Sequence, residues 1–202
     1  IEHVPDPVAV LADMRRRLAP GGRIFLSVPD AEANSGDILV VDHLNHFSQD
    51  SLERALNLAG LSARSMDREA FHGAFAVTAT PEVGDLPAVK CSSAFPRSLD
   101  RWRRILDYID GQELSQRVAI YGAGFYGSVI AARLDVQLSC FLDRNPFLQG
   151  QTHLGVPVLT PEDCPAGIRT VIAGLNPARA REILGSNIEW LPSNATLVFL
   201  DD

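Results

Sequence analysis

The stretch LAPGGRIFLSVP (residues 18–29) decides how the first part of the chain folds. Gly21 and Gly22 end a helix that Pro7 opens, in which apolar residues recur at helical spacing up to Leu18. Residues 24–28 are mostly apolar or β-branched, which predicts a strand buried on both faces of a mostly parallel sheet. A helix, a glycine stop and a buried strand together predict an α/β fold.

The residues after this strand continue the α/β pattern. A polar loop leads to DHLNHFS (residues 42–48), and Ser48 or Asp50 can cap a helix that Gly60 ends. A closing pair of strands is predicted at residues 61–66 and 71–78.

A linker and an amphipathic helix are expected next. Residues 81–96 contain prolines and little periodicity, which is typical of a linker. Leu99, Trp102 and Ile109 then mark one face of a helix, which we expect to pack on the following unit. We therefore predict three segments, at residues 1–80, 81–116 and 117–202.

The third segment opens with a glycine-rich motif. After a strand at residues 118–121 come Gly122, Gly124 and Gly127 in the spacing G-x-G-x-x-G, then an apolar helix and a strand that ends at Asp143. This order is typical of dinucleotide-binding units, in which the loop binds a phosphate and the acid binds a ribose. The alternative is architectural: the glycines allow a tight turn and close packing, and Asp143 is a turn residue at the strand end.

The remainder of this segment predicts a small parallel sheet. Strand candidates at residues 170–173 and 196–200 flank a helix that begins near Pro177. The segment has room for about one mononucleotide-binding half of a Rossmann fold, which weighs against a full dinucleotide site.

Composition excludes several classes of function. The 202 residues carry a net charge of −7 without a basic block, so we expect no nucleic-acid partner. The three cysteines form no C-x-x-C pair, which argues against a disulfide framework and against a metal site. No apolar run is long enough for a membrane span, and Ile1 opens no targeting peptide, so we expect a cytoplasmic protein without a membrane partner.

Two motifs of the first segment resemble a known enzyme class. The runs EHVPDP (residues 2–7) and LAPGGRIFLSVP are similar to the second half of class I S-adenosylmethionine-dependent methyltransferases. This resemblance implies that the main cofactor site lies upstream of Ile1. It also implies that the chain is the C-terminal portion of a larger methyltransferase and is inactive alone.

The third segment carries a second resemblance. The run DRNPFLQGQTHLGVPV (residues 143–158) is similar to the C-terminal domain of sugar C-methyltransferases and to a nucleotide-sugar-binding domain of some sugar acyltransferases. It implies a nucleotide or a nucleotide-sugar at the glycine loop and a small-molecule substrate, such as a nucleotide-linked sugar. The chain departs from the Y-x-E-H motif of the sugar enzymes, because VVDH stands at residues 40–43. The subfamily stays open.

Three residues are candidates for catalysis. His43 can accept a proton from the methyl acceptor while Asp42 orients its ring, and the alternative is a hydrogen-bonded spacer in a loop. His3 is expected at the carboxyl end of a strand, where α/β sheets bind ligands, and the alternative is a role in the turn before Pro5. His46 is expected only to precede the anchor Phe47.

A methyltransferase portion is the function that these patterns favour. The rival interpretation is a nucleotide-binding or docking module without catalysis of its own, and a weaker one is an NAD-dependent oxidoreductase. An incomplete first sheet would expose an apolar edge, so we also expect a homo-oligomer.

Overall fold

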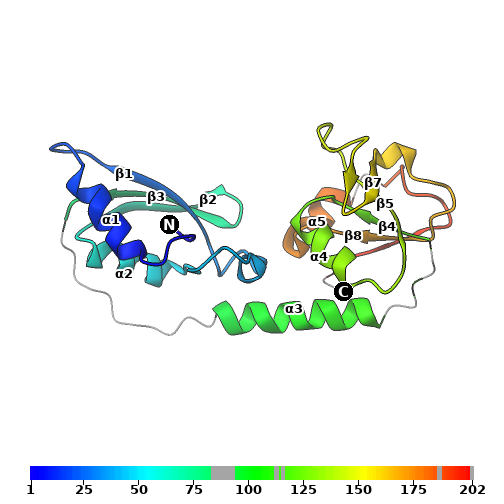
Figure 1. Cartoon of the computed structure of the whole chain (residues 1–202), viewed down its shortest axis with the longest axis horizontal. Helices are drawn as coiled ribbons and strands as arrows, with labels where there is room; N and C mark the ends of the chain where they lie inside the picture. Colours follow the sequence, from blue (N-terminus) through cyan, green and yellow to red (C-terminus); the bar gives the residue numbers. More distant parts are fainter. Residues whose placement is uncertain (83–93, 112–113, 115–116, 186–187, 201–202) are drawn as a thin grey trace. The chain divides into compact units, whose positions relative to one another are not determined.

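The computed structural model describes residues 1–82, 94–111, 114, 117–185 and 188–200. The chain divides into two compact units, Ile1–Trp102 and Arg103–Asp202, each with its own sheet (Figure 1). The predicted α/β class is confirmed, with a small sheet followed by a mostly parallel one. The division falls inside a helix, and residues 83–93 of the expected linker lie outside the described residues, so the three-segment division stays a prediction.

The first unit contains a three-stranded antiparallel sheet with the order β1-β3-β2. The predicted closing pair is present as a hairpin. Its turn lies at His72 and Gly73, whereas the predicted strands left residues 67–70 for the turn, so Phe71 belongs to the first strand of the pair. The elements are α1 (Pro7–Arg16), β1 (Ile24–Pro29), η1 (Asp37–Leu39), α2 (Gln49–Leu58), β2 (Ser62–Phe71) and β3 (Ala74–Thr80).

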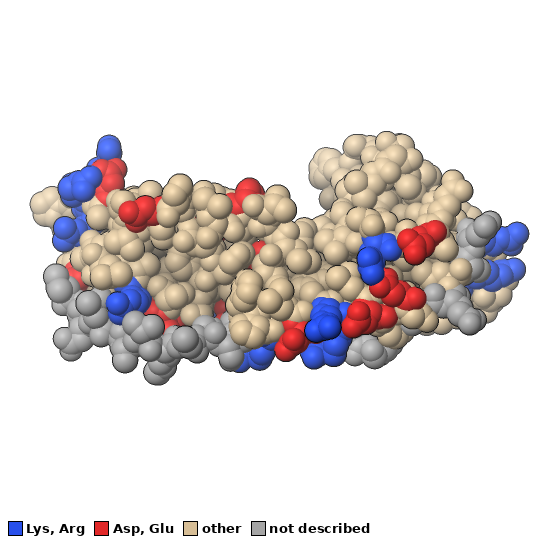
Figure 2. Space-filling model, turned by 60° about the horizontal axis from the view of Figure 1, so that its bottom comes forward, with Lys and Arg blue, Asp and Glu red and all other residues tan. Residues whose placement is uncertain are grey.

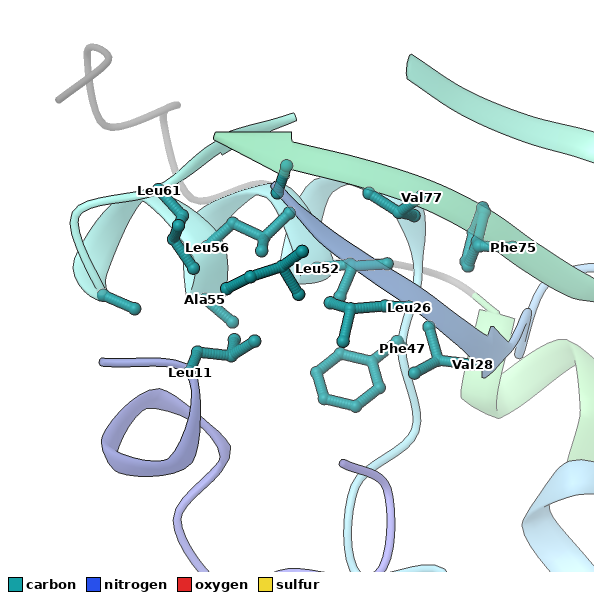
Figure 3. Close-up of a cluster of buried hydrophobic side chains, with 13 residues drawn as sticks. Leu11, Leu26, Val28, Phe47, Leu52, Ala55, Leu56, Leu61, Phe75 and Val77 are labelled. Atoms are coloured by element: carbon teal, nitrogen blue, oxygen red, sulfur yellow. The ribbon is translucent and has the colours of Figure 1, made fainter. Parts of the chain in front are cut away.

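One face of this sheet carries the hydrophobic core (Figure 3). Leu26 and Val28 of β1 and Phe75 of β3 pack with buried side chains of both helices, including Leu11 and Leu52. The expectation that β1 is buried on both faces is wrong. Its side chains alternate between buried and exposed, and Phe25 is 63% exposed. Among the described residues, β1 pairs only with β3, in antiparallel fashion, so nothing here makes it an interior strand of a parallel sheet.

The start of α2 is fixed by a reciprocal cap. The Ser48 hydroxyl accepts from the Ser51 backbone amide, and the Ser51 hydroxyl accepts from the Ser48 amide. Of the two predicted capping residues, Ser48 is therefore the cap and Asp50 lies in the first turn. Gly60 ends the helix region with a positive φ of 74°.

The amphipathic helix α3 (Ala94–Asp110) buries Trp102, Ile105 and Ile109, whereas Leu99 of the expected apolar face is exposed. The Trp102 indole Nε1 donates to the Ser35 carbonyl at 2.7 Å. The first half of α3 therefore packs on the first unit, although the sequence led us to expect it on the second.

The second unit contains a six-stranded sheet with the order β6-β7-β5-β4-β8-β9, in which only β6 is antiparallel. The strands predicted at residues 118–121, 138–142 and 170–173 are confirmed, whereas β6 and β7 were not predicted. The elements are β4 (Val118–Tyr121), α4 (Phe125–Arg133), β5 (Leu138–Leu142), β6 (Thr152–His153), β7 (Val156–Leu159), η2 (Pro161–Asp163), β8 (Thr170–Ala173), α5 (Pro177–Leu184) and β9 (Thr196–Val198). None of the described helices is both long enough and apolar enough to cross a membrane.

Candidate active site

A buried carboxylate holds two imidazoles in the first unit. Asp37 lies at the start of η1, and its side chain is 0% exposed. The His43 Nδ1 lies 2.6 Å from one carboxylate oxygen of Asp37, and the His46 Nδ1 lies 2.6 Å from the other. Because an ionised carboxylate only accepts hydrogen bonds, both histidines donate through Nδ1–H. In the neutral imidazoles, Nε2 is then the nitrogen with a free lone pair.

The side chains of His3 and Asp42 lie beside His43. The rings of His3 and His43 meet edge to face, with their centroids 4.7 Å apart. The His3 Nδ1 lies 3.2 Å from the Asp42 carbonyl oxygen and 3.3 Å from its carboxylate, both of which are acceptors. Glu2 approaches the other nitrogen of His3, with Oε1 3.6 Å from Nε2. His3 therefore also presents Nε2 as its free nitrogen.

Backbone hydrogen bonds explain why segments far apart in the sequence meet here. The amides of Leu44 and Asn45 both donate to the Glu2 carbonyl, at 2.8 and 3.0 Å. The Asn45 side-chain amide donates to the Val4 carbonyl at 2.7 Å. These bonds attach the histidine loop, residues 42–46, to the segment before α1, which places His3 against His43.

In the 202-residue chain the pKa of the Glu2 carboxyl lies below its usual value. Burial acts to raise the pKa of Glu2, but hydrogen bonds from its own backbone amide and from the Ile1 amino group outweigh burial, so the pKa is lowered. The cluster therefore contains the three carboxylates Glu2, Asp37 and Asp42 around three imidazoles.

The structure changes the expected pairing of the catalytic candidates. His43 and His3 do lie together, but the residue that orients His43 is Asp37, and Asp42 instead contacts His3. Sequence reasoning missed Asp37 because it precedes His43 by one 3₁₀ turn and a loop. It also gave His46 no role, although His46 shares Asp37 with His43. The available signal was an acidic residue shortly before an H-x-x-H spacing.

In the second unit, two of the three fingerprint glycines serve packing. A Cβ atom on Gly127 would lie 2.0 Å from the Gly122 carbonyl oxygen, and one on Gly122 would lie 2.6 Å from the Gly174 carbonyl oxygen. Gly122 also has a φ of 105°, which side chains rarely adopt. Gly124 differs, because a Cβ atom there would meet nothing within 4 Å. Of these three glycines, Gly124 is therefore the one beside which a ligand has space.

Asp143 fastens the glycine loop to the end of β5. One carboxylate oxygen accepts from the Ala123 amide at 2.8 Å, and the other accepts from the Asn145 amide at 2.8 Å. The Gly122 amide donates to the Leu142 carbonyl. A phosphate would therefore meet the backbone from Gly124 onward, and a ribose would share the Asp143 carboxylate with these two amides.

A charged group borders this loop at the carboxyl ends of the strands. Arg144 pairs with Glu162 at 3.1 Å. Burial raises the pKa of the Tyr121 hydroxyl, although Arg144 acts to lower it through a hydrogen bond. β4 and β8 are neighbours in the sheet, but the chain continues from β4 to β5 on one side and from β8 to β9 on the other side. The carboxyl ends of two such strands are the position where α/β sheets bind ligands.

The surface charge is mixed on the face shown in Figure 2, where acidic and basic side chains are interspersed. The described ion pairs include Arg17 with Asp13 and Arg133 with Asp110. Hydrogen bonds from Arg17 and Arg16 hold the pKa of Asp13 below its usual value.

Comparison with known proteins finds a similarity for part of the first unit. A search of curated proteins gave no significant match. Residues 1–65 match a family model described as a methyltransferase domain. The match covers α1, β1, η1, α2 and the whole Asp37 and histidine cluster. Residues 1–65 are therefore similar to a methyltransferase domain, and the candidate active site lies within the matched residues.

Proposed function

We propose that the chain is part of an S-adenosylmethionine-dependent methyltransferase that acts on a small molecule, such as a nucleotide-linked sugar. The observation that carries the proposal is the His43 imidazole, oriented by buried Asp37 inside the residues that match a methyltransferase domain. A cytoplasmic location is part of this proposal, and there the thiols of Cys140 and Cys164 would stay reduced.

The described residues of the first unit fit the acceptor side of this reaction. The resemblance assigns the main cofactor site to a glycine-rich loop and an acid that would precede Ile1. When bound, S-adenosylmethionine supplies an electrophilic methyl group. The role of this chain is to bind the acceptor beside His43 and to take its proton on Nε2. Asp37 keeps the proton-bearing Nδ1 turned away and stabilises the imidazolium that forms.

Substitution of His43 tests the proposal in the complete enzyme. His43→Gln should lower kcat by about 10²-fold or more, because that is the usual contribution of a positioned base. His72→Gln, in the exposed turn after β2, is the matched control and should leave kcat unchanged. An unchanged rate for a folded His43→Gln enzyme would leave His43 with a structural role only.

A second candidate function belongs to the second unit, namely the binding of a nucleotide or a nucleotide-sugar. The observation that favours it is the open space at Gly124, close to the carboxyl ends of the neighbours β4 and β8, from which the chain continues to opposite sides of the sheet. Such a ligand should raise the melting temperature of the chain by binding the folded state. Gly124→Val should abolish the rise, whereas Gly124→Ala should reduce it less. No rise with NAD, NADP, UDP-sugars or dTDP-sugars would indicate an architectural loop.

A further inference from the structure

The side chains of Glu2, His3 and His43 are arranged like the ligands of a metal ion. One donor atom from each lies within 4.8 Å of the others. The Glu2 Oε1 and the His3 Nε2 are 3.6 Å apart, which is too long for a hydrogen bond. Two ligands bound tetrahedrally to one zinc-sized ion at the usual bond lengths are separated by about 3.4 Å.

Both histidines of this group have the outer partners that metal-binding histidines require. Such histidines almost always donate their second ring N–H to a carboxylate or a backbone carbonyl, which fixes the tautomer and the ring direction. Here the His43 Nδ1 donates to Asp37 at 2.6 Å. The His3 Nδ1 lies 3.2 Å from the Asp42 carbonyl. Each ring is thereby left with the Nε2 lone pair that a metal ion binds.

The charge around these rings favours a cation. Asp37 is completely buried, and among the described residues its ion-pair partners are only His43 and His46. A cation bound to the His43 Nε2 would place a positive charge close to this buried carboxylate, which favours binding because buried carboxylates are stabilised by a charged partner. Glu2 contributes a second carboxylate, whose Oε2 contacts the Ile1 amino group while Oε1 faces His3.

We propose that Glu2, His3 and His43 bind one divalent first-row transition metal ion, with Asp37 and Asp42 as outer partners. Two imidazoles and one carboxylate suit zinc or cobalt and leave a coordination position for water or a substrate oxygen. Magnesium and calcium prefer oxygen ligands throughout and fit poorly. The neighbouring group of Asp37, His43 and His46 is less suitable, because its short N···O distances are those of hydrogen bonds.

Metal binding would affect the proposed methyl transfer. This effect rests on the proposed function, whereas the metal site does not. The ion takes the same His43 Nε2 that would accept the proton of the methyl acceptor. Bound zinc should therefore inhibit methyl transfer in the complete enzyme, and a chelator should restore it. Binding of the metal itself does not depend on any activity.

The test is a titration of the full 202-residue chain with Co²⁺, followed by its visible absorption, with displacement by Zn²⁺. We expect one ion per chain. His3→Gln and Glu2→Gln should each weaken binding by at least about tenfold, and Asp37→Asn by about 10- to 100-fold through loss of the outer partner. His72→Gln and Glu189→Gln, both at exposed positions, are controls and should bind like the unchanged chain.

His3 is half exposed, so His3→Gln should fold even if Asp37→Asn does not. Absence of Co²⁺ absorption in the unchanged chain would overturn the proposal, as would equal affinity of the His3→Gln chain. Binding without inhibition would support the metal site and argue against His43 as the base. No binding, together with loss of activity in His43→Gln, would overturn the metal site alone.

Discussion

Asp37 illustrates how one buried side chain can organise several others. Its two oxygens each accept from a different histidine, and its backbone amide donates to the Asn34 carbonyl. Asp42, only five positions later in the chain, is 70% exposed and contacts one half-exposed ring. The two aspartates therefore form a natural pair for comparing a buried carboxylate with an exposed one.

Asp37→Ala should lower the free energy of unfolding by about 1–3 kcal/mol, because two imidazole N–H groups lose their buried acceptor. Asp42→Ala should change it by less than about 0.5 kcal/mol, as is usual at exposed positions. Urea denaturation of the two variants measures the difference. Equal stability of both variants would show that Asp37 is not the organising residue.

The Cys140 thiol predicts a response to pH. Burial raises its pKa from 9.0 to about 12, and the nearby Cys164 adds to the rise. The thiol therefore stays protonated in the folded chain while it ionises near pH 9 in the unfolded chain. Its contribution to stability is complete below pH 9.0 and is lost as the pH rises toward about 12.

Alkylation followed by peptide mass spectrometry measures this protection. Only the thiolate reacts, so native Cys140 should remain unmodified by iodoacetamide at mildly alkaline pH and should react once urea is added. Cys164, which is only partly buried, is the internal comparison and should react faster in the native chain. Rapid modification of native Cys140 would contradict the prediction.

At this scale the sequence could identify His43 and His3 but not the contacts between side chains. The histidines were recognisable from the DHLNHFS and EHVPDP runs. Their partners depend on how η1 turns Asp37 back toward the loop, and on the bonds from Asn45 to Glu2 and Val4. No local pattern encodes the hydrogen bonds between segments about forty residues apart that bring His3 to His43. Asp37 is only six residues from His43, but the sequence alone does not show that the intervening turn brings its carboxylate, and not that of the adjacent Asp42, to the His43 ring.

Among the elements, the strand–loop–helix unit of β4 and α4 is built on contacts between backbones. Gly127 of α4 lies against Gly122, and a Cβ atom on Gly174 would meet the Gly127 Cα at 2.8 Å. A glycine inside a helix normally weakens it, so these residues are explained by the close approach of helix and strand.

Gly127→Ala should therefore destabilise the chain by about 2–3 kcal/mol through overpacking, although alanine is the better helix former. Gly124→Ala places its methyl group in open space and should change the stability by less than about 0.5 kcal/mol. Thermal unfolding of the two variants provides the comparison. A stable Gly127→Ala chain would mean that α4 can move away from β4 easily.

The start of α2 offers a third comparison between variants. Ser48→Ala removes the side-chain acceptor of the Ser51 amide and should reduce stability by about 0.5–2 kcal/mol. Asp50→Ala, within the first turn, should have a smaller effect, because Asp50 is not the cap. The reverse order in urea denaturation would identify Asp50 as the more important residue.

Helices and strands were predicted correctly from the sequence where proline or glycine marks their ends. Pro7 and Pro177 open α1 and α5, and Gly60 follows α2, as expected. The short strands β6 and β7 were missed because Gly155 and Pro157 are residue types typical of loops, and only pairing with β5 makes β7 a strand. The burial of β1 was overestimated because an apolar run does not reveal whether both faces are covered.

For the whole molecule, the uncovered side of the first sheet is the feature with the clearest consequence. In the described part of the chain β1 is an edge strand, and Phe25 projects from its exposed face. Unpaired strand edges with apolar side chains promote association between chains. We therefore expect the isolated chain to self-associate through the first unit.

Sedimentation over a wide range of concentrations tests this expectation. Phe25→Lys should shift the chain toward monomer, because a charge on an edge strand disfavours pairing. Phe147→Lys, at an 82% exposed position in the second unit, is the matched control and should not. A monomer at all concentrations would contradict the prediction.

The parallel order of the second sheet also bears on how the chain is synthesised. The central strand β4 pairs with β5 and β8, and both follow it in the sequence. On the ribosome, β4 must therefore wait for residues 138–142 to pair with one of its edges and for residues 170–173 to pair with the other, whereas the β2–β3 hairpin can close as soon as it leaves the tunnel. Nonlocal pairing of this kind is slow, so the second unit should be the part of the nascent chain that most needs chaperones.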